Sequence, residues 1–349
     1  MSDKSAQPTH ERRLHDQVNL ATPDGARLNP DAVGWSSAPL HRANLRGSWG
    51  RNKRWDYWAV LAGDLVVAAT FADIDYLGIA DVYWVDLATG STGGAAAASP
   101  LGRGLELPER PGTAPLTFHH KRLDLTMDDP DDGTTIISAR WTESDGSPAE
   151  LEAQIALPDG HESLNVVIPW NDELFNYTSK HQARPATGQL TVGDRRWRIG
   201  GDGSDAWGVL DVGRGRWPAE IAWNWGGGAG RCGDHVVGLQ FGAKWTEGSG
   251  YTENGLIVNG RLTKLGRELD WTYDWDEPLN PWRVVDPGGQ LDVTLQPRYD
   301  KHTKLPGRDQ GSETHQVFGT WSGRLRSDDG IELEVHDLQG FAEEARQEW

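Results

Sequence analysis

The chain consists of short runs in which apolar and polar positions alternate, separated by turn residues. Residues 55–61 (WDYWAVL) and 65–71 (LVVAATF) flank a Gly-Asp turn, an arrangement typical of a β-hairpin. Asn259 and Gly260, between two further apolar runs, form the strongest hairpin signal in the chain. The same pattern predicts further strands at residues 79–87, 116–126, 134–141, 150–157, 164–170, 188–199, 220–225, 235–245, 252–258, 261–273, 290–296, 314–326 and 332–338.

About eight strands are predicted in each half of the chain, and no helical pattern lies between them. Folds that alternate strands and helices are therefore excluded, which leaves antiparallel barrels or sandwiches. We predict an all-β protein of two tandem antiparallel lipocalin-like β-barrels with a short C-terminal helix. An eight-stranded barrel is just wide enough to hold one small ligand.

The domain boundaries follow from changes in composition. Residues 1–34 are polar and predict an N-terminal extension that is partly ordered or wraps the surface. A polar joint before residue 185 separates a first barrel, residues 35–185, from a second barrel, residues 186–349. Residues 88–112 are rich in Gly, Ala, Ser and Pro and predict a long loop. The terminal residues 340–349 (GFAEEARQEW) have the composition of a helix.

Composition and charge narrow the range of partners. The net charge of −18 repels polyanions, so nucleic acid and anionic membrane surfaces are unsuitable partners, and an apolar small molecule suits the chain better. No apolar run is long enough for a membrane span. Cys232 is the only cysteine and the first residues lack the apolar core of a signal peptide, so we expect a cytoplasmic protein. The sequence leaves the oligomeric state undefined.

The stretch from residue 210 to 259 concentrates the unusual chemistry, and the 18 Trp exceed what packing requires. Rings interleaved with a few carboxylates, amides and guanidiniums are the composition of a ligand pocket. Trp223, Asn224 and Trp225 lie in a predicted strand, which places both rings on one face and the amide on the other. This face is either a substrate platform or barrel core. The following three glycines allow a backbone or ligand to come close.

Three carboxylates are candidate catalytic residues. Asp211 lies with Arg214 around a predicted turn, where the two either form an internal ion pair or make an acid–base group beside a substrate-binding guanidinium. Glu253 and the neighbouring Asn254 begin a strand, near a barrel mouth or at a solvated strand end. Asp75 either lines the mouth of the first barrel or lies on the surface.

Three further residues are candidate substrate-binding groups: Tyr177 and Lys180 at the joint between the halves, and Trp58 in the first hairpin. We predict neither cofactor nor metal, because nucleotide-binding loops, a GxSxG elbow, HExxH and CxxC are all missing from the sequence. His119 and His120 lack a third ligand at a suitable spacing. Any catalysis would then depend on proton transfer by acidic and basic side chains.

Several motifs resemble a known family: IPW at 168–170, FNYTSKH at 175–181, GVLDVGRGRWP at 208–218, AWNWG at 222–226, YTENGLIVNGRLTKL at 251–265 and, further out, KRWDYW at 53–58 and HQVFGTWSG at 315–323. Together they resemble an uncharacterised bacterial family of Trp-rich proteins catalogued as a domain of unknown function. That family is in turn similar to the double-lipocalin superfamily of carotenoid 1,2-hydratases, tocopherol cyclases and decalin-forming Diels–Alderases.

The resemblance implies two tandem barrels with a pocket, within or between them, for an apolar substrate. It also implies a carboxylic acid that protonates an alkene beside aromatic faces that stabilise the resulting cation. The catalytic residues of the relatives do not align with this chain, so the candidates Asp211, Glu253 and Asp75 rest on the present sequence alone.

Three functions remain open. The first is a cofactor-free enzyme that hydrates, cyclises or isomerises an apolar, terpenoid- or polyketide-like molecule. The second is a non-catalytic carrier of a hydrophobic ligand, and the third is a carbohydrate-active protein that uses Trp platforms and paired carboxylates. One isolated buried acid in an apolar pocket favours the first function. Two inward carboxyls beside a ring platform favour the third, and no inward acid favours the carrier.

Overall fold

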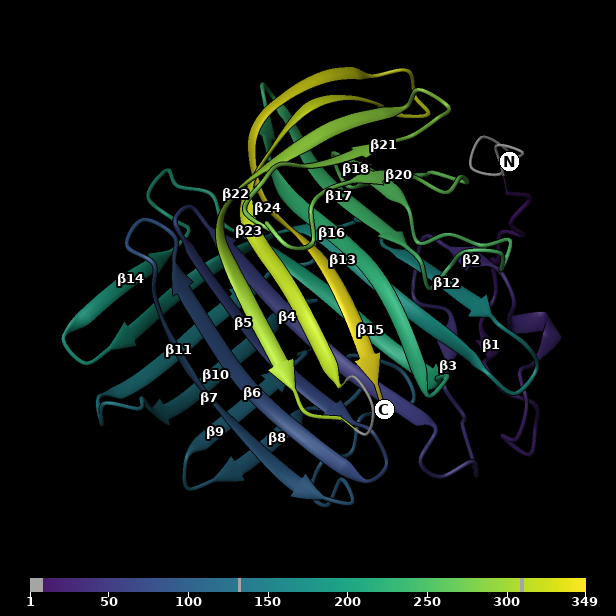
Figure 1. Ribbon diagram of the computed structural model, residues 1–349, viewed down its shortest axis with the longest axis horizontal. Coiled ribbons are helices and arrows are strands. Elements are labelled where there is room, and N and C mark those ends of the chain that lie inside the picture. The colour runs from purple at the N-terminus through teal and green to yellow at the C-terminus, as the bar shows by residue number, and fades with distance from the viewer. Residues whose placement is uncertain (1–8, 131–132, 308–310) are drawn as a thin grey trace.

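The fold, described by a computed structural model for residues 9–130, 133–307 and 311–349, consists almost entirely of β-strands (Figure 1). The one helical element in those ranges is the 3-10 turn η1, Pro30–Ala32. No helix of the described chain is long and apolar enough to cross a membrane. The predicted all-β class is therefore confirmed.

The first of two large sheets has 13 strands among the described residues. Its main path is β7-β6-β5-β4-β15-β13-β11-β10-β9-β8, and neighbouring strands are antiparallel. The sheet curls on itself until β6 and β7 lie against β9 and β10, which encloses a first hydrophobic core. Its strands are β2 Trp35–Ser36, β4 Asn52–Ala62, β5 Leu65–Asp73, β6 Leu77–Asp86, β7 Ser91–Pro100, β8 Leu116–His120, β9 Leu123–Asp128, β10 Thr135–Thr142, β11 Pro148–Ile155, β12 Leu164–Pro169, β13 Phe175–Val192, β14 Arg195–Ile199 and β15 Trp207–Arg216.

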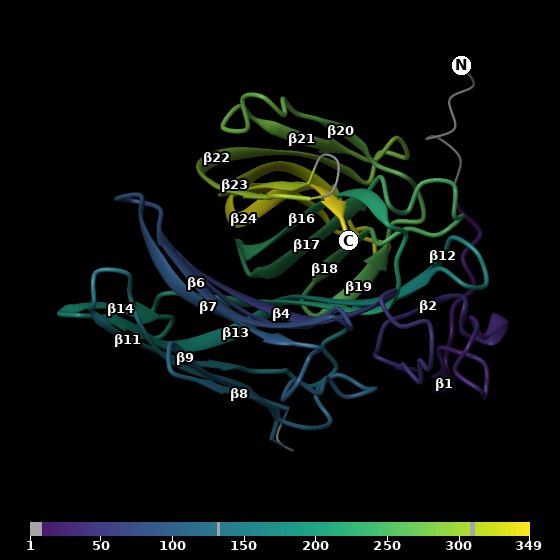
Figure 2. The same ribbon diagram turned by 60° about the horizontal axis from the view of Figure 1, so that its bottom comes forward.

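The second sheet has nine strands in the part of the chain that is described, in the order β19-β18-β17-β16-β24-β23-β22-β21-β20. It encloses a second core and lies over the concave side of the long strands β4 to β7 (Figure 2). Two barrel-like antiparallel sheets are thus present, as predicted. Its strands are β16 Glu220–Cys232, β17 His235–Ala243, β18 Gly255–Val258, β19 Arg261–Lys264, β20 Asp270–Thr272, β21 Trp282–Val285, β22 Leu291–Leu305, β23 Ser312–Arg326 and β24 Glu332–Glu348.

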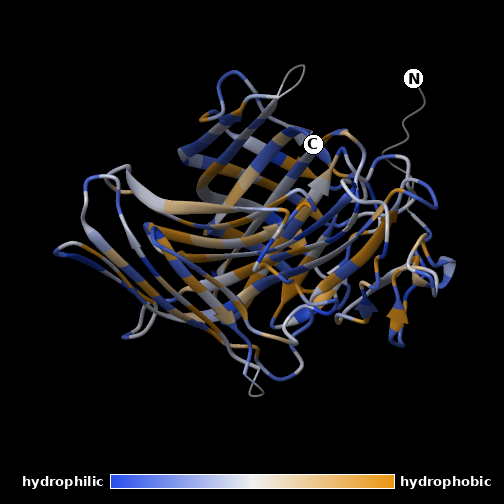
Figure 3. Cartoon of the chain, turned by 90° about the horizontal axis from the view of Figure 1, so that it is seen from below, coloured by the Kyte–Doolittle hydropathy of each residue, from blue (hydrophilic) through white to orange (hydrophobic). Residues whose placement is uncertain are grey.

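Alternation of side chains explains why these segments form strands. In β9, Leu123, Leu125 and Met127 are buried in the first core, whereas Asp124 is exposed on the other face. Figure 3 shows the same alternation of apolar and polar residues along many strands. Because successive side chains of a strand point to opposite faces, each sheet gains one apolar face for its core.

The outer face of the first sheet is also buried over β4, β5, β6 and β15, because the second sheet packs against it there. Side chains of β4, β5, β6 and β15 meet Trp225 of β16, Phe318 of β23 and Phe341 of β24 in a separate cluster. All ten residues of β15 are consequently buried. The two sheets therefore form one packed body rather than two barrels on a linker.

The boundary predicted near residue 185 falls inside β13, the longest strand of the first sheet. A bulge between His181 and Arg184 interrupts its pairing with β15, and beyond the bulge the strand pairs with β11 and β14. Since β15 also belongs to the first sheet, the strands of the second sheet start only at Glu220. We propose that the two structural units divide between residues 216 and 220.

The predicted C-terminal helix is wrong, because residues 340–348 continue β24 as a strand between β16 and β23. The Ala, Glu and Arg residues of this segment favour a helix in isolation, but pairing on both sides overrides that preference. The loop predicted at residues 88–112 likewise contains β7, whose Gly and Ala residues pair along β6.

The N-terminal segment covers one end of the first sheet. It contains the short strands β1, Val18–Asn19, and β3, His41–Arg42, which pair with each other in parallel. Its apolar residues pack against Val167, Phe175 and Tyr177 of β12 and β13. Residues 9–34 therefore lie against the first sheet, and residues 1–8 of the predicted extension lie outside the described residues.

Candidate functional site

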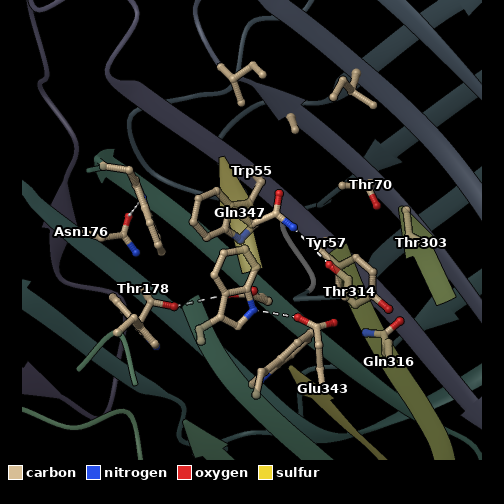
Figure 4. Close-up of a pocket in the computed structure, with 18 of the residues that line it drawn as sticks. Trp55, Tyr57, Thr70, Asn176, Thr178, Thr303, Thr314, Gln316, Glu343 and Gln347 are labelled. Atoms are coloured by element: carbon tan, nitrogen blue, oxygen red, sulfur yellow. Dashed lines mark hydrogen bonds between the residues drawn. The ribbon is translucent and has the colours of Figure 1, made fainter. Parts of the chain in front are cut away.

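A cavity of about 400 Å³ lies between the two sheets. Its walls come from β4, β5, β6, β13 and β15 of the first sheet and from β16, β22, β23 and β24 of the second, with loop residues between them. Figure 4 shows ten of the lining side chains by name. The lining residues are Trp55, Tyr57, Thr70, Ala72, Ile74, Ile79, Asn176, Thr178, Lys180, Asp211, Trp217, Trp223, Trp225, Trp245, Glu253, Lys301, Thr303, Thr314, Gln316, Glu343, Gln347 and Trp349.

A group of tryptophans around Trp217 forms one wall. The Trp217 ring stacks on Trp245 with centroids 5.5 Å apart, and Trp55, Trp170, Trp223 and Trp349 contact it at centroid distances of 5.1 to 6.2 Å. The Trp217 indole N–H donates a hydrogen bond to Asn176 Oδ1 at 3.2 Å (Figure 4). Rings that contact one another on several sides hold fixed positions, so this wall is rigid and apolar.

Two glycines make room for the cavity side chains. A Cβ at Gly213 of β15 would lie 2.1 Å from the ring of Trp55, and a Cβ at Gly242 of β17 would lie 2.0 Å from Glu253 Oε1. No side chain tolerates either approach. The absence of a side chain at these two positions therefore lets the Trp55 ring and the Glu253 carboxyl lie flat on the backbone.

Lys180 connects two carboxylates at the base of the cavity. Lys180 and Asp211 are cross-strand partners on β13 and β15, and the Lys180 Nζ atom lies 2.7 Å from Asp211 Oδ1 and 3.4 Å from Glu253 Oε2. The ammonium also lies 4.4 Å from the centroid of the Trp225 ring, a cation–π contact. Burial alone would lower the pKa of Lys180, but the attraction of Asp211 and Glu253 outweighs it and raises the pKa.

Glu253 carries an elevated pKa. Its side chain is almost fully buried, and burial raises its pKa to about 7 against the attraction of Lys180. Trp245 donates its indole N–H to Glu253 Oε1 at 2.5 Å. One ammonium cannot neutralise two buried carboxylates, so near neutral pH this group of three retains an exchangeable proton.

Glu343 of β24 is a second buried carboxyl with an elevated pKa. Burial raises its pKa to about 7, and Trp223 donates its indole N–H to Glu343 Oε1 at 2.7 Å. An indole N–H can only donate, so the oxygen facing it must be an acceptor. The proton of the neutral acid therefore belongs on the other oxygen, which Figure 4 shows directed away from the indole.

Five of the predicted site residues line the cavity: Lys180, Asp211, Trp223, Trp225 and Glu253. The two Trp rings share one face of β16, as the alternation predicted. The three glycines that follow Trp225 accommodate neighbouring side chains, including Gln182, Phe341 and Trp321.

Arg214 and Asn224 lie on the opposite faces of their strands. The predicted turn at residues 211–216 is part of β15, so Asp211 and Arg214 point to different sides of the sheet. Arg214 is fully buried, with its Nη2 atom 2.6 Å from Asp56 Oδ1. Asn224 donates to the hydroxyl of Tyr273 at 3.0 Å and to the carbonyl of Glu343 at 3.1 Å.

Four other predicted residues lie outside the cavity lining and have structural contacts. Asn254 bonds the backbone of Gly242 and Arg267, and Tyr177 donates to Asn165. The remaining two are Trp58, which belongs to the first core beneath the guanidinium of Arg184, and Asp75, which accepts hydrogen bonds from the backbone of Asn52 and the Asn52 side chain.

The main residue missed by the sequence prediction is Glu343, together with Gln347 and Trp349. The sequence does contain a signal that could have identified these residues. Positions 343, 345, 347 and 349 alternate with period two and therefore share one face when the segment is a strand. The helical assignment of this segment concealed that face. The cross-strand pairing of Trp225 with Glu343, which brings the carboxyl beside the Trp platform, requires the sheet order and cannot be read from sequence.

Comparisons with known proteins agree with the architecture. Residues 11–349 match the family described as Domain of unknown function (DUF2804), and the chain belongs to that family. A search of curated protein sequences gives no match. Among solved structures, an AttH-like protein from Nitrosomonas europaea aligns with a TM-score of 0.50 and 12% identity, covering 86% of this chain and 93% of that chain. Kievitone hydratase from Nectria haematococca aligns with a TM-score of 0.50 and 13% identity, covering 86% of this chain and 89% of that chain.

Replacing Arg214 by Met should reduce stability strongly. The substitution leaves Asp56 buried without its cation, and breaking a buried ion pair on one side typically costs about 3–5 kcal/mol. Urea unfolding of wild type and variant measures the loss. Arg231→Met, which breaks an exposed pair with Asp205, is the control and should cost far less. Equal losses in the two variants would contradict a structural role for Arg214.

The pKa of Glu343 predicts an unusual dependence of stability on pH. The folded protein retains a proton up to about pH 7, whereas the unfolded chain releases it near its ordinary value of 4.5. Between these pH values the contribution of Glu343 to the free energy of unfolding falls as pH rises, by roughly 1.4 kcal/mol per pH unit. Gln cannot ionise, so Glu343→Gln should gain stability relative to wild type across this window. Urea unfolding of both proteins from pH 4.5 to 7.5 measures the difference, and a difference independent of pH would contradict the raised pKa.

Proposed function

We propose that this protein is a cofactor-free acid–base enzyme that hydrates, cyclises or isomerises an apolar small molecule in the cavity between the sheets. The observation that carries the proposal is Glu343: a buried carboxyl in a Trp-lined cavity, with one oxygen held by Trp223 and the other available to a substrate. A pKa of about 7 leaves a substantial protonated fraction near neutrality, as a general acid requires.

In the proposed reaction Glu343 donates its proton to an alkene carbon of the substrate and becomes a carboxylate. The face of Trp223 stabilises the positive charge that develops on the neighbouring carbon. Addition of water or of a substrate group, or loss of a second proton, then removes that charge. Asp211, ion-paired with Lys180, is the candidate acceptor of the released proton, and Glu253 exchanges protons within the same group of three.

One end of the cavity is polar and favours a substrate with a single polar group. Lys301, Thr303, Thr314 and Gln316 line it from β22 and β23, and Lys301 Nζ lies 4.1 Å from the centroid of the Tyr83 ring. The Trp wall suits a terpenoid- or polyketide-like skeleton, and Lys301 suits a carboxylate or an acidic hydroxyl. These contacts would fix which carbon faces Glu343.

The competing functions differ in what they require of the carboxyls. A plain carrier gains nothing from three inward acids, whose burial is costly. The number of acids beside the rings is, however, the feature expected of a carbohydrate-active protein. The shared architecture with kievitone hydratase supports a hydration reaction by analogy of fold. This support is an analogy only, because one fold can host different activities.

The first experiment identifies the ligand class, by native mass spectrometry of protein purified from its own host and by thermal shift with panels of isoprenoids, polyketides and oligosaccharides. We expect an apolar compound to be bound and to raise the melting temperature. Stabilisation by oligosaccharides alone would overturn the proposal in favour of the carbohydrate function.

With a substrate identified, Glu343→Gln should lower kcat at least 100-fold while the Kd for substrate changes little, because the amide keeps the shape but cannot donate the proton. The rate of the wild-type enzyme should fall as pH rises above about 7. Glu332→Gln, at the exposed start of the same strand, is the matched control and should retain activity. Wild-type turnover in Glu343→Gln would remove Glu343 as the acid.

A further inference from the structure

Two histidines and a glutamate gather on the face of β22 and β23 opposite the cavity. His302 and His315 are direct cross-strand partners, and their rings stack with centroids 4.2 Å apart and planes 7° apart. Glu313 lies diagonally across from His302, with Oε1 2.8 Å from His302 Nε2. One ligand atom from each of the three residues lies within 4.8 Å of the others. Three donors at this separation can meet on a single ion once the half-exposed His302 ring turns out of the stack, because an imidazole lone pair lies in its ring plane.

Hydrogen bonds with Asp300 and Lys304 hold the His315 and Glu313 side chains in position. Asp300 Oδ2 lies 2.8 Å from His315 Nδ1, which orients the ring and leaves Nε2 for a ligand bond. Carboxylate–histidine contacts of this kind accompany metal sites in general. Asp300 Oδ1 is buried without a hydrogen-bond partner in the described structure. Lys304 occupies the second oxygen of Glu313 at 3.2 Å and leaves Oε1 facing the histidines.

The surroundings favour an ion with one open coordination position. The His315 side chain is buried and its ring lies nearly perpendicular to that of Trp275, with centroids 4.6 Å apart, whereas the His302 side chain is 45% exposed. Solvent therefore reaches the group from the His302 side. Two imidazoles and one carboxylate are the donors preferred by Zn²⁺ and similar divalent transition ions, and are poorly suited to Ca²⁺ or Mg²⁺.

We propose that His302, Glu313 and His315 bind a divalent transition-metal ion, with Zn²⁺ the best match to the donors and a solvent molecule as the fourth ligand. The spacing of these residues along the chain does not reveal such a site, because the ligands come from two strands joined by antiparallel pairing. Lys301, Thr303, Thr314 and Gln316 lie on the other face of the same strands. The ion would cross-link the two strands directly behind the polar end of the cavity.

Isothermal titration of the untagged full chain with Zn²⁺ tests the proposal, and Co²⁺ substitution supplies a visible spectrum that reports imidazole coordination. We expect one equivalent to bind in the wild type. His302→Ala, His315→Ala and Glu313→Gln should each weaken the affinity at least 10-fold, and Asp300→Asn about 10-fold because it only positions His315. Lys304→Met should tighten binding, since it removes a cation that competes for Glu313.

His119→Ala is the matched control, because His119 is an exposed strand histidine whose Nδ1 lies 2.6 Å from Asp124, away from this group. It should bind Zn²⁺ as the wild type does. Circular dichroism and urea unfolding confirm that each variant is folded, and the half-exposed His302 makes His302→Ala the safest of them. Absence of Zn²⁺ binding by folded wild type, or unchanged affinity in both histidine variants, would overturn the proposal. Neither outcome depends on the proposed enzyme activity.

Discussion

The arrangement depends on one constraint: the part of the first sheet formed by β4, β5, β6, β13 and β15 is covered on both faces. Its inner face encloses its own core, and its outer face packs against the second sheet. A sheet with one solvated face can place any polar residue there, but here every polar group on the outer face must find a partner. The ion pair of Lys180 and Asp211 and the hydrogen bond of Trp217 to Asn176 satisfy that requirement inside the gap. The cavity exists where this packing is incomplete.

The electrostatics of the cavity follow from the same burial. Asp211 lies beside Lys180, Glu253 shares the same ammonium, and Glu343 accepts a hydrogen bond from the indole of Trp223. Burial raises the pKa of both Glu253 and Glu343 to about 7, because their hydrogen bonds and nearby ammonium groups only partly offset the cost of burying a charge. Two carboxyls that exchange protons near neutral pH thus face one small space, as acid–base chemistry requires.

Much of the fold follows from the sequence, but the site follows only in part. Alternation and hairpin turns predict an all-β chain, because a strand with one buried face has a clear period of two. Where both faces are buried, the pattern cannot tell which face a residue occupies. Asp211 and Arg214 are both charged and both buried on β15, yet only Asp211 faces the cavity. Glu343 was hidden for a different reason, since Ala- and Glu-rich composition indicates a helix unless the neighbouring strands are known.

The division of the cavity walls between two sheets has a thermodynamic consequence. A molecule in this space contacts both sheets at once, so whatever binding free energy it contributes also acts to hold them together. Ligand binding and association of the two sheets are then thermodynamically linked, so each stabilises the other. A substitution outside the cavity lining that loosens the interface around Phe318 and Phe341 would weaken binding without touching the ligand, and a tight ligand would restore the lost cohesion.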